Sequence, residues 1–184
     1  MEVLIHFLFE IVKIVILSVV YSLVLFIVIK MFSKKQTKDF KLWLKMNLLI
    51  YILLFIFMFT HWGNHGFGDS ARIPLKKGLA LENIDWVPVA SIEDIQTENQ
   101  SPLETTEFLI VSDKLLGNLQ SNFYDYSNQY FILDLKSEEL IEFENETKFD
   151  VYLYKNKLPD RSSLLGFEKN YNQYWSGWRF WLLP

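Results

Sequence analysis

IVILSVVYSLVLFIVI, residues 14–29, is an uncharged apolar run inside the longer apolar segment Val12–Phe32, and a second such segment, Leu42–Thr60, follows closely. Each segment is near the roughly 20 residues that a helix needs to cross the hydrocarbon core of a bilayer. The connection between them is the short stretch SKKQTKDFK, residues 33–41. We therefore expect residues 1–61 to form a two-helix transmembrane hairpin, and the chain to be an integral membrane protein.

The charges around this loop predict the orientation of the hairpin. Against one acid, Asp39, stand six lysines: Lys30, Lys34, Lys35, Lys38, Lys41 and Lys45. Short cytoplasmic loops beside membrane spans carry such an excess of basic residues. We expect loop 33–41 to lie in the cytoplasm and both chain ends outside. A cleaved signal peptide fits poorly, because no basic residue precedes Lys13 and the basic cluster follows the apolar run.

The two parts of the chain differ in charge. Residues 1–61 hold seven lysines and three acids, a net charge of +4, whereas residues 62–184 hold eight lysines, three arginines and nineteen acids, a net charge of −8; their sum is the −4 of the whole chain. Nucleic-acid binding needs a basic face. We therefore expect no nucleic acid among the partners of the acidic part.

The sequence has no cysteine, which excludes disulfides, thiolate metal ligands and thiol catalysis. A domain the size of residues 71–184 is large enough to be stabilised by its apolar core alone. The abundance of Ile, Phe, Lys, Asn and Tyr suits an AT-rich genome and favours a bacterial cytoplasmic membrane.

Residues 62–70 form a glycine-rich segment in which Gly63, Gly66 and Gly68 lie close together. Glycine loops that cradle phosphates stand between a strand and a helix. Here an expected membrane helix precedes the glycines, and RIPLKK, an apparent strand, follows them. We interpret residues 62–70 as a flexible or tightly turned linker by which the chain leaves the membrane.

From residue 71 onward, short apolar runs alternate with turn residues, which predicts a small α+β extracytoplasmic domain of antiparallel strands with one or two short helices. We expect a hairpin of Arg72–Lys76 and Leu79–Asp85, an edge strand within Trp86–Ile92, and a polar linker or surface loop over Ile95–Thr105. Further strands are expected at residues 108–112, 114–120, 129–135 and 139–143, with a turn at Lys136–Glu138.

A short helix is expected over Glu146–Asn156. Asn145 is a suitable N-cap, an acid lies in the first turn, and Pro159 stops the helix. Beyond it, the tail YNQYWSGWRFWLLP, residues 171–184, combines six aromatic residues with an arginine. Such a composition occurs at binding hot spots and at membrane interfaces. Three roles are open for this tail: closure of the domain core, packing onto the hairpin or lipid, and docking of a partner.

Few residues qualify as candidates for site chemistry. The three histidines, His6, His61 and His65, are all expected at the outer membrane surface, and His61, His65 and Asp69 could in principle bind a metal or serve a hydrolase. However, HWGNHGFGD is not the helical HExxH motif, and the pattern favours anchoring and turn formation as the role of these residues. Glu10 and Lys13 could likewise form an ionisable pair inside the membrane, or simply begin the helix at its interface.

No catalytic, cofactor-binding or metal-binding residue is therefore assigned from the sequence, and an enzyme is not favoured. The leading hypothesis is a membrane-anchored accessory or interaction protein whose acidic domain contacts a membrane-protein partner or a second copy of the chain. The alternative is a membrane-edge metal-binding protein or hydrolase that uses His61, His65 and Asp69. A third hypothesis, a transport component using Glu10 and Lys13, requires oligomerisation, because two helices cannot enclose a pore.

Overall fold

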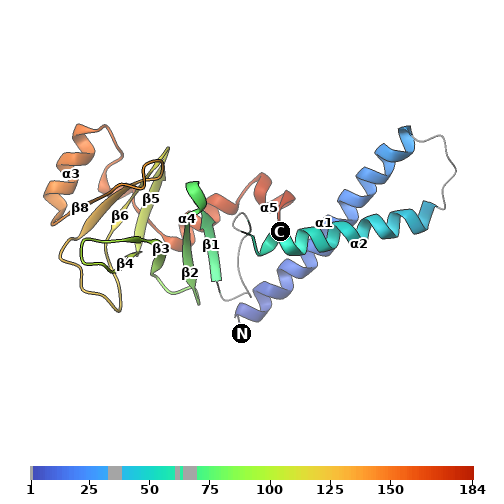
Figure 1. The fold of residues 1–184 in the computed structure, drawn as a ribbon, viewed down its shortest axis with the longest axis horizontal. Coiled ribbons are helices and arrows are strands. Elements are labelled where there is room, and N and C mark those ends of the chain that lie inside the picture. Colours follow the sequence, from blue (N-terminus) through green and yellow to red (C-terminus); the bar gives the residue numbers. More distant parts are fainter. Residues whose placement is uncertain (1, 33–38, 61–62, 64–69) are drawn as a thin grey trace. The chain divides into compact units, whose positions relative to one another are not determined.

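The computed structural model describes residues 2–32, 39–60, 63 and 70–184, which form two compact units (Figure 1). The helical unit comprises residues 1–69 together with 176–184, and the sheet unit comprises residues 70–175. The α+β prediction is confirmed: two long helices precede two antiparallel sheets and several short helices. Residues 176–184, which the sequence places with the domain 71–184, instead group with the helical unit.

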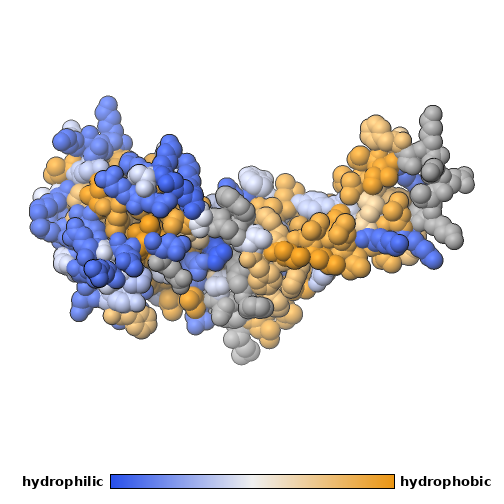
Figure 2. All heavy atoms as spheres, viewed as in Figure 1, coloured by the Kyte–Doolittle hydropathy of each residue, from blue (hydrophilic) through white to orange (hydrophobic). Residues whose placement is uncertain are grey.

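The helical unit begins with α1, Glu2–Phe32, and α2, Asp39–Met58. Neither helix contains glycine or proline, and both are apolar around their whole circumference. Phe7–Phe32 and Phe40–Met58 are long and apolar enough to cross a membrane, although a signal sequence near the N-terminus would meet the same criteria. Hydrophobic residues cover α1 and α2 in Figure 2, whereas hydrophilic residues predominate over the sheet unit.

Polar side chains join α1 to α2. The amide nitrogen of Asn47 lies 3.3 Å from the hydroxyl oxygens of both Ser18 and Ser22. Both serines are buried, and each hydroxyl also donates to the carbonyl three residues earlier, that of Val15 or Val19. The spacing of four residues between the serines places them on one face of α1. This contact therefore defines the face on which the two helices pack.

The chain turns tightly after α2. The N–H of Gly63 donates to the carbonyl of Thr60 at 3.0 Å. A Cβ atom at residue 63 would lie 2.3 Å from the carbonyl oxygen of Met58, so only glycine fits this turn. A tight turn at Gly63 is one of the two interpretations of the glycine-rich segment; Gly66 and Gly68 lie outside the described residues.

The first sheet has four antiparallel strands in the order β1-β2-β3-β4: Ser70–Pro74, Ala80–Ile84, Ala90–Gln96 and Pro102–Thr105. The hairpin of β1 and β2 is confirmed, with Ser70 opposite Ile84 and Pro74 opposite Ala80. Its connection contains the 3₁₀ turn η1, Lys76–Gly78, in which Lys77 and Gly78 have positive φ angles of 56° and 84°.

Two boundaries in this sheet were predicted wrongly. The third strand is Ala90–Gln96 rather than Trp86–Ile92, because the chain turns at Asp85 and Trp86, which both have φ of 56°. The side chain of Asn83 stabilises this turn by donating to the carbonyls of Val87 and Val89 at 2.6 and 2.7 Å. These hydrogen bonds of Asn83 hold a turn where the apolar pattern of Trp86–Ile92 predicts a strand.

The expected linker Ile95–Thr105 is also wrong. It contains the end of β3, a turn, and β4, which pairs with β3 through Ala90–Thr105 and Ile92–Leu103. The turn is only the stretch from Thr97 to Ser101, closed by a 2.9 Å hydrogen bond between them. In β4 the half-buried Pro102 and Glu104 alternate with the buried Leu103 and Thr105, but four residues are too few for the sequence to show this pattern clearly.

The second sheet has five antiparallel strands in the order β8-β7-β6-β5-β9. The four predicted strands are confirmed as β5, Glu107–Val111; β6, Lys114–Asn118; β7, Tyr130–Asp134; and β8, Leu140–Phe143. The predicted turn at Lys136–Glu138 is formed by Asp134, whose carboxylate accepts the N–H groups of Lys136 and Ser137 at 2.8 and 3.1 Å. The fifth strand, β9, Leu165–Gly166, is too short for sequence patterning to detect.

The short helices close the sheet unit. The predicted helix is α3, Glu146–Lys155, and Asn145 is its N-cap, accepting the N–H of Lys148 at 3.0 Å. It buries Phe149 and Leu153 in a core cluster with Leu116, Ile132, Phe143 and Leu164. The chain then forms the 3₁₀ turn η2, Arg161–Ser163, and two further helices, α4, Phe167–Trp175, and α5, Trp178–Leu182.

Helix α4 joins the two sheets. It contacts β1 of the first sheet and β5 and β9 of the second. The indole N–H of Trp175 donates to the carbonyl of Arg72 at 2.8 Å, and the buried amide of Asn170 donates to the carbonyls of Phe108 and Leu165, each at 2.8 Å. Aromatic packing adds to this joint, since Trp86 meets Tyr171 edge to face at 5.1 Å between centroids.

Candidate functional site

The metal or hydrolase alternative is not tested by the structure. His61, His65 and Asp69 lie outside the described residues, as does the side chain of His6. Among the residues that are described, no three His, Cys, Asp or Glu side chains are grouped as metal ligands. The alternative stays a prediction, and metal analysis of the purified protein tests it.

Glu10 and Lys13 are brought together as the spacing predicted. The Lys13 ammonium lies 3.6 Å from the Glu10 carboxylate, one turn apart on α1, and Glu10 is only 3% exposed. The same ammonium lies 5.1 Å from the centroid of the Phe180 ring of α5. Lys13 thus contacts both a carboxylate and an aromatic ring, an arrangement that stabilises a cation away from bulk water. The geometry is that of a paired charge at a packing contact.

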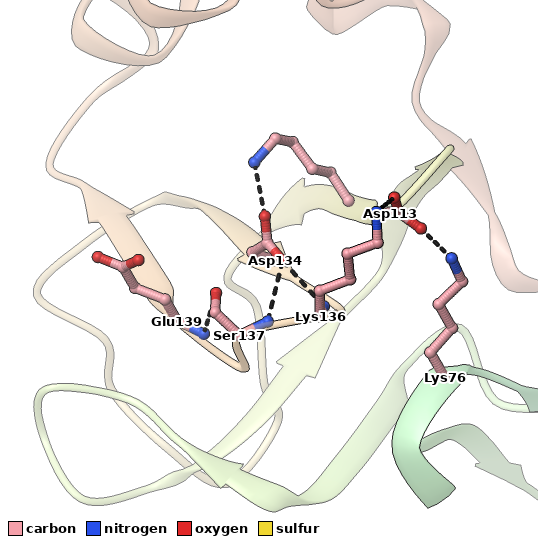
Figure 3. Close-up of polar contacts among 7 residues, drawn as sticks. Lys76, Asp113, Asp134, Lys136, Ser137 and Glu139 are labelled. Carbon is pink, nitrogen blue, oxygen red and sulfur yellow. Dashed lines mark hydrogen bonds and ion pairs between the residues drawn. The ribbon is translucent and has the colours of Figure 1, made fainter.

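A cluster of charged side chains surrounds the turn after β7 (Figure 3). Asp113, between β5 and β6, pairs with Lys76 of η1 and with Lys136. Asp134 pairs with Lys114 at 3.0 Å. Hydrogen bonds from the lysines hold the pKa of Asp113 below its usual value, and the N–H of Lys136, followed by Lys114, holds that of Asp134 well below its usual value.

These charges link β-structure rather than form a reaction centre. Lys76 belongs to the connection between β1 and β2, whereas Asp113 belongs to the second sheet, so their ion pair bridges the two sheets. The Asp113 carboxylate has a lysine on either side, and because hydrogen bonds from these lysines lower its pKa, it is ionised near neutral pH. The cluster therefore acts as a polar connection between the sheets.

Asp134→Asn is expected to reduce the sensitivity of the sheet unit to acid. Because the pKa of Asp134 is depressed by folding, its carboxylate stabilises the fold above the unfolded-state value of about 3.9, and this contribution is lost as the pH falls through the lower folded-state value. Urea midpoints of the full-length protein in detergent at pH 7 and pH 3 measure the effect.

Asp125→Asn is the matched control for this substitution, because no ion pair of the Asp125 carboxylate is seen in the described part of the chain. The difference between the two midpoints should shrink for Asp134→Asn and stay close to that of the unsubstituted protein for Asp125→Asn. Equal acid sensitivity in all three proteins would contradict the assignment.

A groove of about 900 Å³ is lined by residues of α3 and η2, Arg161 among them. The guanidinium pairs with Glu146 at 2.6 Å and Asp150 at 3.4 Å and donates to the Tyr130 hydroxyl at 3.2 Å. The Tyr130 hydrogen bond, with the two carboxylates, raises the pKa of Arg161 above its usual value. Glu107 and Asp160 also line the groove, so carboxylates outnumber the single arginine.

The groove lacks the groups that nucleophilic catalysis requires. Its serine, Ser162, donates its hydroxyl to Asp160, and the same carboxylate accepts the Ser162 N–H at 3.0 Å. This is the N-cap of η2 rather than a nucleophile with a base, because the carboxylate is already committed to the turn. Hydrogen bonding to Ser162 accordingly lowers the pKa of Asp160. The lining of the groove is therefore more acidic than basic.

Sequence reasoning missed Arg161, although a signal was present. The acidic part of the chain contains three arginines, and this one follows Pro159-Asp160 directly after the predicted helix. An arginine that follows a helix carrying acids four residues apart, Glu146 and Asp150, is a candidate ion-pair partner for that helix face. Its partner Tyr130 comes from β7 and could not be recognised without the tertiary structure.

The aromatic tail is divided between the two units. Tyr171 and Trp175 are buried in the sheet unit, so core closure holds for the first half of the tail. Trp178, Phe180 and Trp181 lie in α5 within the helical unit and are 59%, 43% and 72% exposed. The second half packs on α1, because the Tyr21 hydroxyl donates to the Leu182 carbonyl and the Lys13 ammonium lies 5.1 Å from the Phe180 ring. Core closure thus holds for the first half of the tail, and packing onto the hairpin holds for the second.

No protein-family model matches the sequence, and no curated protein or solved structure matches it significantly.

Proposed function

We propose that this chain is a membrane-anchored interaction protein in which α1 and α2 span a bilayer and the sheet unit is presented outside the cytoplasm to a partner protein. The observation that supports this proposal is the contrast between the exposed surfaces of the two units, one apolar and one mostly polar. Large apolar side chains are exposed along α1 from Leu4 to Phe32 and along α2 from Phe40 to Ile56. An apolar surface of this extent requires a cover, and a bilayer covers both helices at once.

The lysines support the orientation. Lys30, Lys41 and Lys45 lie at the ends of α1 and α2 that meet loop 33–41. Basic residues at one end of a hairpin favour the cytoplasmic side. The acidic sheet unit follows from the other end, where it is repelled by anionic lipid headgroups and is free to contact protein.

A loop of the sheet unit suits partner contact. Phe123 is 85% exposed in the connection between β6 and β7, yet that connection is held in place. The Ser121 hydroxyl accepts the N–H groups of Phe123 and Tyr124 at 2.9 and 3.0 Å. The Tyr126 hydroxyl donates to the Pro102 carbonyl at 2.7 Å and accepts the Glu104 N–H at 3.2 Å.

Burial raises the pKa of Tyr126 to about 12, so this hydroxyl keeps its proton and its hydrogen bond at physiological pH. A rigid loop that holds an aromatic side chain in water loses little entropy when the ring enters a partner. We therefore place Phe123 at the partner interface.

Recovery of the full-length protein from native membranes in mild detergent tests the proposal. A companion protein in constant ratio is expected, and Phe123→Ala should reduce its recovery at least tenfold, because aromatic hot spots contribute about 2 kcal/mol or more. Asn122→Ala is the matched control on the same loop and should retain the companion. A solitary monomer, or equal recovery with Phe123→Ala, would remove the partner proposal.

The absence of cysteine allows the orientation to be checked in the same preparation. A membrane-impermeant maleimide should label Tyr154→Cys on intact cells, because Tyr154 is 90% exposed in the sheet unit. Lys35→Cys, in the loop between the helices, should be labelled only after permeabilisation. The reverse pattern would overturn the orientation, and recovery of the protein in the soluble fraction would overturn the anchor.

A further inference from the structure

Helix α5 returns to the helical unit after the sheet unit is complete. The Tyr21 hydroxyl of α1 donates to the carbonyl of Leu182, and Lys13 of α1 lies 5.1 Å from the ring of Phe180. Lys13, Leu17 and Tyr21 are spaced four residues apart and so follow one side of α1. Leu17, between the two contacts, is buried. Two contacts about 12 Å apart along the helix hold α5 against α1.

The outward side of α5 is aromatic and uncovered within its own unit. Trp178 and Trp181 are 59% and 72% exposed, and Leu182 is 47% exposed. The Arg179 guanidinium lies 5.0 Å from the Trp178 ring. Tryptophan and arginine are both amphipathic, with an apolar body and a polar end, and such side chains are stable where hydrocarbon meets water.

Helix α1, on which α5 packs, exposes large apolar side chains of its own. Val12, Ile16 and Val20 of the same helix are 56%, 58% and 49% exposed. Lipid that covers these side chains of α1 would therefore also come close to α5, which packs on the same helix.

We propose that α5 is a lipid-contacting element in which Trp178 and Trp181 lie at the boundary between headgroups and acyl chains on the side of the membrane that carries the sheet unit. This inference rests on the proposed membrane anchor and adds a second attachment to it. The sheet unit is then an insertion between α2 and α5, connected to the membrane through both of its ends.

The ends of the sheet unit are arranged for such an insertion. The indole of Trp175, its last residue, donates to the carbonyl of Arg72 in β1, its first strand, at 2.8 Å. The last residue of the sheet unit therefore lies against its first strand. A second attachment restricts rotation of the sheet unit about its first.

Single-cysteine variants of the full-length protein in phosphatidylcholine vesicles test the inference, since the chain has no cysteine of its own. A nitroxide on Trp181→Cys is compared with one on Leu25→Cys, exposed on α1, and one on Tyr154→Cys, exposed on the sheet unit. Collisions with oxygen and with a water-soluble nickel complex report depth. We expect Leu25→Cys deep in the bilayer, Tyr154→Cys in water, and Trp181→Cys between them.

The outcomes separate the inference from the proposed function. If Leu25→Cys is deep and Trp181→Cys is as accessible to nickel as Tyr154→Cys, the inference is overturned and the anchor stands. If Leu25→Cys is in water, both are overturned. Shielding of Trp181→Cys from oxygen and nickel alike means that protein covers α5, which also overturns the inference.

A second measurement avoids the loss of a tryptophan anchor by cysteine substitution. Quenching of tryptophan fluorescence by lipids brominated near the headgroup should be weaker in Trp178→Phe/Trp181→Phe than in the unsubstituted protein, because phenylalanine preserves apolar contact and removes the fluorophore. Trp86→Phe, in the sheet unit, is the control: it removes one fluorophore outside the lipid and should leave the intensity lost to quenching unchanged. Unchanged quenching in the double variant would contradict lipid contact by α5.

Discussion

Asn170→Asp should unfold the sheet unit at neutral pH and allow partial recovery in acid. The Asn170 amide nitrogen donates to the carbonyls of Phe108, Leu165 and Gly166 at 2.8, 2.8 and 3.3 Å, and the residue is 7% exposed. A carboxylate in its place would present negative oxygen atoms to three carbonyl dipoles. An uncompensated buried charge costs about 3–5 kcal/mol, a large fraction of the 5–15 kcal/mol that stabilises a typical domain.

The pH dependence identifies the cause. Burial and the facing carbonyls should raise the pKa of the introduced carboxyl above the unfolded value of about 3.9. A raised folded-state pKa means that the deficit is greatest at high pH and shrinks as the pH falls and the group is protonated. The protonated acid also regains one O–H donor for the three carbonyls. Circular dichroism near 218 nm during urea unfolding in detergent follows the strands.

Asn172→Asp provides the matched control, because Asn172 is an exposed residue of the same helix. It introduces the same charge two residues away and should change the midpoint little. Both variants are compared with the unsubstituted protein at each pH, which removes the acid sensitivity of the other carboxylates. A deficit of Asn170→Asp that is the same at pH 7 and pH 4.5 would show that shape rather than charge causes it.

The elements that could be predicted from the sequence are those whose signal is local and long. Long uncharged runs without glycine or proline predicted α1 and α2, and Asn145 with the acid after it predicted the start of α3. Strands β5 to β8 were found because their apolar runs are bounded by turn residues. These signals need no knowledge of distant contacts.

The elements that were missed depend on tertiary contacts. Strand β4 has only four residues, two of them polar, and it pairs because the turn at Thr97–Ser101 returns it to β3. The two residues of β9 pair with Glu107 and Phe108 because α4 holds them there through Asn170. The division of the aromatic tail at Ser176 also depends on residues far away in the sequence. The Trp175 indole donates to the Arg72 carbonyl, whereas the Leu182 carbonyl accepts the Tyr21 hydroxyl.

Among the candidate site residues, too, only those close together in the sequence could be predicted. The Glu10–Lys13 pair could be predicted because both residues lie on one helix turn. The Arg161 centre joins residues from β7, α3 and η2, so its assembly requires the packing of α3 on the second sheet. The sequence also could not distinguish a lipid-facing role of α5 from closure of the domain core, because it does not show that the tail divides between the two units after Trp175.

Gly117→Val is the second substitution with a large expected effect, and it should prevent the second sheet from forming. Gly117 lies in the interior strand β6, directly opposite Phe131 of β7. A Cβ atom at residue 117 would lie 2.7 Å from the Phe131 ring and 3.0 Å from the carbonyl oxygen of Glu107. Phe131 is fully buried, so its ring has no free space to enter. The aromatic ring occupies the place that a side chain of β6 would take.

Overpacking of this kind costs about 1–3 kcal/mol for a small addition. We expect Gly117→Ala to lose an amount in this range and Gly117→Val, which adds two further methyl groups, to leave little of the domain's stability. Gly166→Ala is the matched control in the same sheet, because its Cβ would have only one neighbour, the Thr106 carbonyl oxygen at an ordinary 3.8 Å. Urea midpoints of the full-length variants in detergent provide the comparison.

A double-mutant cycle separates the ring from the backbone contact. If the Phe131 ring is the obstacle, Phe131→Leu should reduce the cost of Gly117→Ala, so that the double variant is more stable than the sum of the two single losses predicts. Strictly additive losses would assign the cost to the Glu107 carbonyl, which no side-chain substitution removes. A Gly117→Ala protein as stable as Gly166→Ala would refute both contacts, and with them the claim that β6 needs glycine at this position because β7 fills its space.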